Sequence, residues 1–132
     1  MTISPLKPHL TIPIALLTNG MDYSASENFT VFMSSAPNVA TFGSTTGGSD
    51  GSPGVYSVMK GVKLSISSWQ ERVTSTVLPI EGFGLHPDYP VYISDTILSQ
   101  ENSYSISGNV KQTMDHDPVL QAARAWVLKQ TN

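Results

Sequence analysis

Two short apolar runs on either side of an amphipathic segment constrain the fold of this 132-residue chain most strongly. Residues 12–18 (IPIALLT) form a continuous apolar run that ends at Asn19-Gly20, and residues 39–42 (VATF) form a second, shorter one. Such runs are typical of strands buried on both faces of a parallel sheet. Between them, residues 24–35 place Ala25, Phe29, Phe32 and Met33 on one side of a helix. The sequence therefore predicts a right-handed βαβ unit.

The middle of the chain predicts an antiparallel hairpin. Residues 55–59 and 62–67 read as strands joined by the Lys60-Gly61 turn. Because Val62, Leu64 and Ile66 alternate with polar residues, we expect one buried face and one polar face. Residues 72–78 are a weaker strand candidate, residues 89–94 are expected to be an edge strand, and residues 95–115 give no clear pattern.

A helix is predicted over residues 118–129. Asp117 is a favourable N-cap and Pro118 suits the first helical position. Leu120, Ala123 and Val127 line the expected buried face. Residues 1–11 are interpreted as a lead-in or linker, because Pro5 and Pro8 interrupt regular structure, and residues 12–132 as the domain proper.

Composition excludes several classes of protein. Seven Lys and Arg against ten Asp and Glu give a net charge of −3, and only 13% of residues are charged. This argues against a nucleic-acid binder and against a disordered acidic segment. The longest apolar run, residues 12–17, is too short to span a membrane. Cysteine is absent, and the DHD run at residues 115–117 fits helix-start charges better than a metal site, so we expect no metal and no cofactor.

The segment LTNGMDYSASENF holds the candidate chemistry. A buried strand ends, turns at Asn-Gly and delivers Ser24 to the start of a helix, where a serine hydroxyl can be exposed and activated. The N–H of Ala25 would face the same space and could stabilise an oxyanion. The commoner explanation of the local pattern is a capping box between Ser24 and Glu27.

Two glycine-containing loops could complete a site. Residues 43–54 (GSTTGGSDGSPG) lack the lysine of a phosphate-binding loop, but their N–H groups could line a substrate groove. In EGFGLHPD, Glu81 could orient a histidine as the acid of a triad, although a surface carboxylate in a turn is the simpler interpretation. None of the histidines, His9, His86 and His116, has a spacing that marks it as the base for Ser24.

These motifs, in this order, resemble the C-terminal half of the catalytic domain of the C-terminal processing peptidases. That serine peptidase family includes the tail-specific proteases and the tricorn core protease. The resemblance runs from about Ile12 to Leu128 and is carried by IALLTNGMDYSASENF, NVATFGSTTGGSDG, EGFGLHPD and DPVLQAARAWVL. It implies a crotonase/ClpP-like α/β superhelix of βαβ units, here a partial domain with added antiparallel strands and a C-terminal helix.

The resemblance also implies roles for individual residues. Ser24 matches the nucleophile, Ala25 an oxyanion-hole donor, and Gly47, Gly48 and Ser49 the loop beside the substrate. Tail-specific proteases carry a lysine base in that loop, where this chain has Ser49; Lys60 and Lys63 follow farther on. The tricorn-like branch uses histidine with a glutamate that Glu81 matches.

The resemblance further implies partners and a location. The histidine, the remaining oxyanion glycine and a PDZ-like module of the family precede the equivalent of residue 12. The chain is therefore expected to need the upstream half of its own catalytic domain and to be inactive alone. The implied substrate is an extended polypeptide and the implied location is the cell envelope, the periplasm or the exterior; a homo-oligomer is compatible with the sequence.

Two other functions compete with the peptidase. One is a non-catalytic peptide-binding or scaffold domain that retains the same fold. The other is a crotonase-like acyl-CoA enzyme, which is disfavoured because no basic pocket for a nucleotide phosphate is evident.

Overall fold

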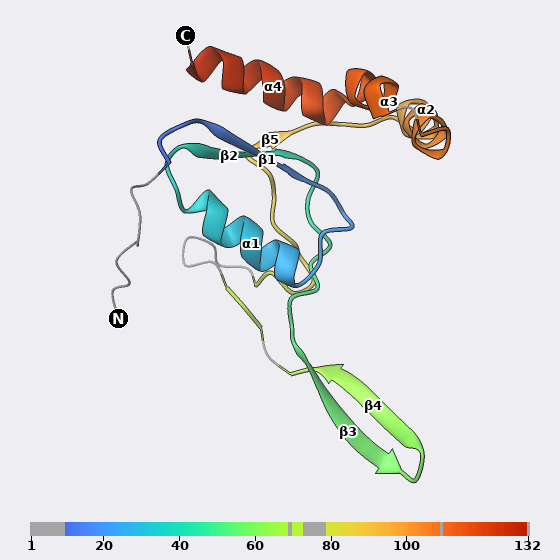
Figure 1. Ribbon diagram of the computed structural model, residues 1–132. Coiled ribbons are helices and arrows are strands. Elements are labelled where there is room, and N and C mark those ends of the chain that lie inside the picture. The colour runs from blue at the N-terminus through green and yellow to red at the C-terminus, as the bar shows by residue number, and fades with distance from the viewer. Residues whose placement is uncertain (1–9, 69, 73–78, 109, 132) are drawn as a thin grey trace.

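A parallel sheet forms the centre of the computed structural model, which describes residues 10–68, 70–72, 79–108 and 110–131 (Figure 1). The strands β1 (Ile14–Thr18), β2 (Val39–Gly43) and β5 (Tyr89–Pro90) lie in the order β1-β2-β5. Both pairings are parallel, and β1 aligns with β2 from Ile14↔Val39 to Thr18↔Gly43. The helix α1 (Ala25–Ser34) connects β1 to β2, so the predicted βαβ unit is confirmed.

Helices cover both faces of this sheet, with α1 on one face and α4 (Pro118–Gln130) on the other (Figure 1). Ala40 and Phe42 of β2 are buried together with Val119 and Ala123 of α4. The ring of Phe42 stacks on Tyr89, with 4.7 Å between ring centroids. The hydrophobic core therefore lies between the central strand β2 and α4.

The C-terminal helix agrees with its prediction in extent and cap but differs in its buried face. Asp117 Oδ1 accepts hydrogen bonds from the N–H groups of Val119 and Leu120 at 2.8 and 3.0 Å. Val119 and Ala123 are buried, whereas Leu120 and Val127 are only half-buried. The helix is therefore rotated slightly from the expected orientation, because Val119 rather than Leu120 meets the sheet.

The strands β3 (Pro53–Met59) and β4 (Val62–Ser67) form the predicted antiparallel hairpin, which projects away from the sheet (Figure 1). The expectation that Val62, Leu64 and Ile66 are buried is wrong, because these side chains are 46–50% exposed. The period-2 pattern is present, but within the described residues no layer covers the apolar face.

The segment between β5 and α4 contains two helices that the sequence did not predict, α2 (Asp95–Ile106) and α3 (Val110–His116). They contact each other, and α3 also contacts α4. Their apolar side chains are too few and scattered to give a helical stripe, which is why the sequence pattern did not predict them. The expected strand at residues 89–94 pairs only at Tyr89–Pro90, where proline removes a backbone donor.

Some predictions fall on residues that the structure does not describe. Of the strand candidate at residues 72–78, only Arg72 is described, and it forms an isolated bridge with Pro79. Of the lead-in at residues 1–11, only residues 10 and 11 are described. In the part of the chain that is described, none of the helices has the length and apolar character needed to cross a membrane.

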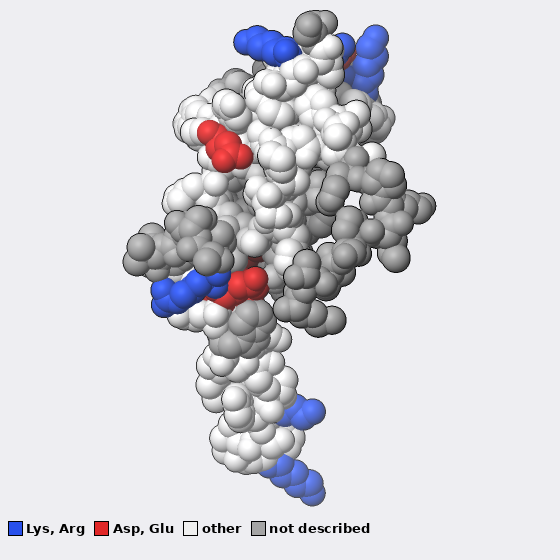
Figure 2. Space-filling view, turned by 90° about the vertical axis from the view of Figure 1, so that its left-hand side faces the viewer, with Lys and Arg blue, Asp and Glu red and all other residues white. Residues whose placement is uncertain are grey.

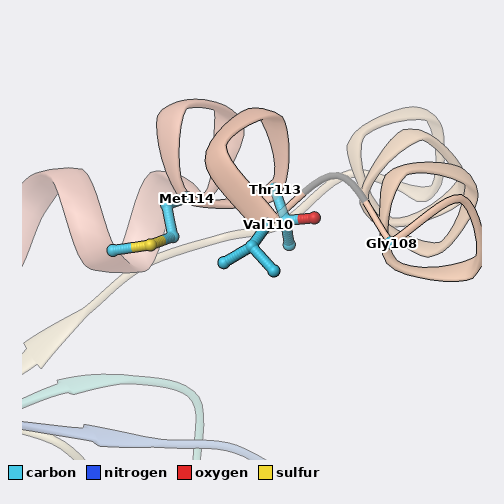
Figure 3. A pocket seen from close by; sticks show the side chains of 4 residues that line it. All are labelled: Gly108, Val110, Thr113 and Met114. Atoms are coloured by element: carbon cyan, nitrogen blue, oxygen red, sulfur yellow. The ribbon is translucent and has the colours of Figure 1, made fainter.

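A small hollow on α3 lies in the helical layer that includes α4 (Figure 3). It is lined by Gly108, Val110, Thr113 and Met114. The lining carries no ionisable group, so this hollow offers no acid, base or charged ligand for chemistry.

Candidate active site at the strand-to-helix corner

Ser24 occupies a sharp corner between β1 and α1. The chain leaves β1 through a turn in which Asn19 Oδ1 accepts from the N–H of Met21 at 2.7 Å. Ser24 then adopts φ 52° and ψ −112°, and it is the only non-glycine residue with positive φ in the described part of the chain. This conformation costs about 1–3 kcal/mol and persists only where surrounding contacts enforce it. The side chain is exposed rather than packed in the core.

A buried glutamate holds this corner. The N–H of Ser24 donates to Glu27 Oε2 at 3.2 Å and to the carbonyl of Ser49 at 2.9 Å. Glu27 is 0% exposed, and its carboxylate also accepts from Thr46 Oγ1 at 2.6 Å and from the N–H groups of Gly48 and Ser49 at 2.8 and 3.0 Å. The capping box predicted for Ser24 and Glu27 is present. The same carboxylate also binds the corner to the glycine-rich loop, a role that sequence reasoning missed.

Ala25 is the first residue of α1 and directly follows Ser24. The first N–H groups of a helix have no partner inside the helix, and the helix dipole makes this end positive. Ala25 is exposed, as is Ser24. The corner thus joins an exposed hydroxyl-bearing residue to the positive end of a helix, an arrangement that can stabilise negative charge on a substrate oxygen.

The glycine-rich loop after β2 turns its N–H groups inward. The N–H of Gly47 donates to the carbonyl of Asp22 at 2.9 Å, while those of Gly48 and Ser49 bind Glu27. The idea that these three N–H groups face a substrate therefore does not fit this structure, because protein acceptors already occupy them. Gly47 lies so close to Tyr23 that an added Cβ would be 1.9 Å from its ring.

The EGFGLHPD turn packs against the same loop. The N–H of Gly82 donates to the carbonyl of Gly48 at 2.7 Å, and Leu85 exchanges hydrogen bonds with Thr46. Glu81 Oε2 accepts from the N–H groups of Asp50 and Gly51 at 2.8 and 2.6 Å. Ser67 Oγ, at the end of β4, donates to Glu81 Oε1 at 3.1 Å. The glycine-rich loop is thus held between Glu27 on one side and Glu81 on the other.

Hydrogen bonding keeps Glu81 ionised. The N–H of Gly51, then the Ser67 hydroxyl and the N–H of Asp50, lower the pKa of the Glu81 carboxyl below its ordinary value. Each of these donors favours the charged form. A carboxylate of this kind can accept the N–H of an imidazole and stabilise the imidazolium that forms in acyl transfer.

Asp50 is a second acid that sequence reasoning missed. It is 3% exposed, and its Oδ1 accepts from Asn28 Nδ2 at 2.8 Å. Its buried Oδ2 has no hydrogen-bond partner among the described residues. Burial raises the pKa of Asp50 to about 6, and the neighbouring Glu71 carboxyl contributes to the rise. The unpartnered Oδ2 is consistent with this direction, because no donor stabilises negative charge on that oxygen.

The structure gives other positions to the remaining candidate bases. His86 Nδ1 forms a hydrogen bond with Thr45 Oγ1 at 2.8 Å, and His9 lies outside the described residues. Lys60 lies in the turn of the β3–β4 hairpin and Lys63 in β4, in the part of the molecule that projects from the sheet. Within the described residues, no group of three or more potential metal ligands comes together.

The chain is similar to a known protein family and to a solved structure. Residues 3–91 match the family model for peptidase family S41. A crystal structure of a protein from Parabacteroides merdae, described as a candidate peptidase, superposes with a TM-score of 0.68 at 24% sequence identity. The match covers 94% of this chain and 34% of that chain, so this chain spans about a third of the neighbour's length. The likeness to that structure concerns the fold alone. No curated protein matches the sequence.

Proposed function

Since the chain belongs to peptidase family S41, we propose that it is the C-terminal part of a serine peptidase catalytic domain with Ser24 as the nucleophile. The observation that supports this most is the backbone of Ser24, at φ 52° and ψ −112°, in an exposed position at the start of α1. A capping serine needs no such strain, because N-caps ordinarily adopt the β region. Nucleophilic serines at strand-to-helix turns do adopt strained conformations.

The proposed reaction is acyl transfer. Ser24 Oγ attacks the carbonyl carbon of the scissile peptide bond while a base takes the hydroxyl proton, and the carbonyl oxygen becomes an oxyanion near the N–H of Ala25. The tetrahedral intermediate collapses, the C–N bond breaks, and the leaving amine receives the proton. Water then attacks the acyl-enzyme while the base takes one of its protons, and this proton passes to Ser24 Oγ as the ester C–O bond breaks and the peptide acid leaves with the other.

The proposed base is a histidine from an upstream segment that Glu81 orients. Glu81 is suited to this because its lowered pKa keeps it ionised, and because Oε1 accepts, among the described residues, a single hydrogen bond, from the exposed Ser67. A lysine base is less consistent with the chain, because Ser49 stands at the matching loop position. We also propose the crotonase/ClpP-like superhelix for the complete domain, on the basis of the βαβ unit with helices on both faces of its sheet.

Without the upstream segment, the chain is expected to bind extended peptide poorly and to hydrolyse none. The substrate class, an extended polypeptide, and a location in the cell envelope or outside the cell are part of the same proposal.

Labelling with a fluorophosphonate tests the nucleophile. The protein is prepared both as the 132-residue chain and with the sequence encoded upstream of it, and adducts are located by peptide mass spectrometry. We expect an adduct on Ser24 in the longer form that Ser24→Ala abolishes. Ser26→Ala is the matched control, since Ser26 lies two residues away in α1, where its hydroxyl donates to the carbonyl of Tyr23. Absence of a Ser24-dependent adduct from a folded longer form, together with retained peptide binding, would instead establish a non-catalytic scaffold.

A further inference from the structure

The carboxylate of Glu81 lies where the β3–β4 hairpin joins the rest of the molecule. Groups from both ends of the hairpin donate hydrogen bonds to it. The N–H groups of Asp50 and Gly51, in the loop before β3, bind Oε2 at 2.8 and 2.6 Å. The hydroxyl of Ser67, the last residue of β4, binds Oε1 at 3.1 Å. Acidic side chains are visible on the surface at this junction (Figure 2), so the base of the hairpin is built around an acid.

The two oxygens of this carboxylate have different surroundings. Each oxygen of a carboxylate can accept about two hydrogen bonds. Oε2 accepts two from backbone N–H groups, whereas Oε1 accepts, among the described residues, only the one from Ser67. Bonds to Oε2 alone would let the carboxylate swing about that oxygen, because the terminal torsion of a glutamate is soft. The Ser67 hydroxyl therefore fixes Oε1 and leaves it able to accept one further donor from a defined direction.

Pairing within the hairpin holds Ser67 in place. Ser67 lies opposite Pro53 in the β3–β4 register, and the N–H of the next residue, Ser68, donates to the carbonyl of Ser52 at 3.2 Å. The hydroxyl is thus carried by a paired strand and approaches the carboxylate from a fixed side. The N–H of Gly51 and, after it, this hydroxyl lower the pKa of the Glu81 carboxyl, so the hydrogen bond favours the ionised acid.

We propose that Ser67 is a positioning residue for the peptidase reaction, which orients Glu81 so that Oε1 accepts the ring N–H of the histidine base. The inference rests on the proposed function, because it needs that histidine from the upstream segment. The imidazole must present one nitrogen to the acid and the other to Ser24 Oγ, so a swing of the acid misplaces the base. The hairpin, which supplies neither the nucleophile nor the acid, thereby contributes to the site.

The rate at which a fluorophosphonate labels Ser24 tests this role, because that rate depends on the base that takes the hydroxyl proton. The rate is measured from about pH 5 to about pH 9 in the form of the protein that includes the upstream sequence. Ser67→Val and Ser67→Thr are a matched pair, since both introduce a β-branched side chain that suits a strand and only Ser67→Thr keeps a hydroxyl. We expect Ser67→Val to slow labelling about tenfold, the low end for a hydrogen bond to a charged group because Ser67 is exposed, and Ser67→Thr to slow it by less than about threefold.

Further variants separate positioning from a loss of structure. Ser65→Val changes the serine two residues earlier on the same face of β4 and should leave the labelling rate at the wild-type value. In a Glu81→Gln background, Ser67→Val should slow labelling no further, because the charge that accepts this hydrogen bond is gone. Ser67→Val should also move the acid limb of the pH profile to higher pH, since Oε1 then keeps more negative charge and favours the imidazolium.

The outcomes that contradict the inference are distinct from those that contradict the proposed function. Equal rates and pH profiles for Ser67→Val and Ser65→Val would overturn the role of Ser67, as would an equal loss in Ser67→Thr. A lower rate at every pH with an unmoved acid limb would show that Ser67 acts on stability only, and circular dichroism would confirm the partial unfolding. Labelling that does not depend on Ser24 would instead remove the proposed function, and the role of Ser67 with it.

Discussion

Replacing Glu27 by glutamine tests whether one buried carboxylate holds the Ser24 corner. The change keeps the size of the side chain and removes one acceptor oxygen. Of the four groups that donate to the carboxylate, Thr46 Oγ1 and the N–H of Gly48 bind Oε1, whereas the N–H groups of Ser49 and Ser24 bind Oε2. A glutamine can keep the first pair through its carbonyl oxygen, but its NH2 group then faces the second pair, which are also donors.

The expected loss of stability follows from the one donor left unsatisfied. The N–H of Ser24 keeps the carbonyl of Ser49 as an acceptor, whereas the N–H of Ser49 faces the NH2 group of the glutamine. A buried donor without an acceptor costs about 1–3 kcal/mol, so Glu27→Gln should lower the free energy of unfolding by about 1–3 kcal/mol, out of the 5–15 kcal/mol that is typical of a domain. With a urea m-value of about 2 kcal/mol/M, the unfolding midpoint should fall by roughly 0.5–1.5 M.

Urea unfolding followed by circular dichroism measures this loss. Asp115→Asn is the matched control, because it also exchanges a carboxylate for an amide, on the exposed surface of α3, and should change stability by less than about 0.5 kcal/mol. If Glu27→Gln were as stable as the control, the carboxylate would not organise the corner, and the role inferred from its four hydrogen bonds would be wrong.

Three further predictions concern the same region. Ser24→Gly should be more stable than Ser24→Ala by about 1 kcal/mol in thermal unfolding, because glycine adopts a φ of 52° at little cost. Equal stabilities of the two variants would show that the backbone at Ser24 is unstrained. The pKa of Asp50 is about 6 in the folded state against 3.8 ordinarily, so between these pH values the folded state holds a proton that the unfolded state has released. The free energy of unfolding is therefore highest below pH 3.8 and falls by up to about 3 kcal/mol as pH rises through 6. Urea unfolding from pH 4 to 7 should show this decline for the wild type and not for Asp50→Asn, and parallel profiles would refute it. Gly48→Ala should destabilise the fold by about 2–4 kcal/mol, because an added Cβ would lie 2.8 Å from the backbone nitrogen of Gly84. Gly61→Ala, at a similar positive φ, meets no atom within 4 Å and should cost about 1 kcal/mol. Equal losses in urea unfolding would contradict the close packing of the two loops.

Local pattern was enough to predict the elements with short-range causes. The apolar runs gave β1 and β2, the helical stripe gave α1, and Asp117-Pro118 marked the start of α4, all confirmed in extent within a few residues. The stripe was wrong about the buried face of α1, because Phe29 and Phe32 are 53% and 70% exposed and the buried residues of the helix are Glu27 and Thr30. Turn chemistry at Lys60-Gly61 gave the hairpin. The helices α2 and α3 were missed because their sequences carry little helical periodicity, and none of their described residues is buried in a core.

The sequence alone determined that a serine with the spacing of a capping box stands between an apolar strand and a helix, because these features depend on residues close together in the chain. Only the tertiary structure decided what the acids do. Glu27 reaches a loop 19 to 22 residues away, and Glu81 reaches the other side of that loop across 30 and 31 residues. No periodicity encodes such contacts, because they arise when parallel strands bring their following loops to the same edge of a sheet. The exposure of the hairpin likewise depends on what packs over it, and a pattern of alternating side chains states that a face is apolar without stating what covers it.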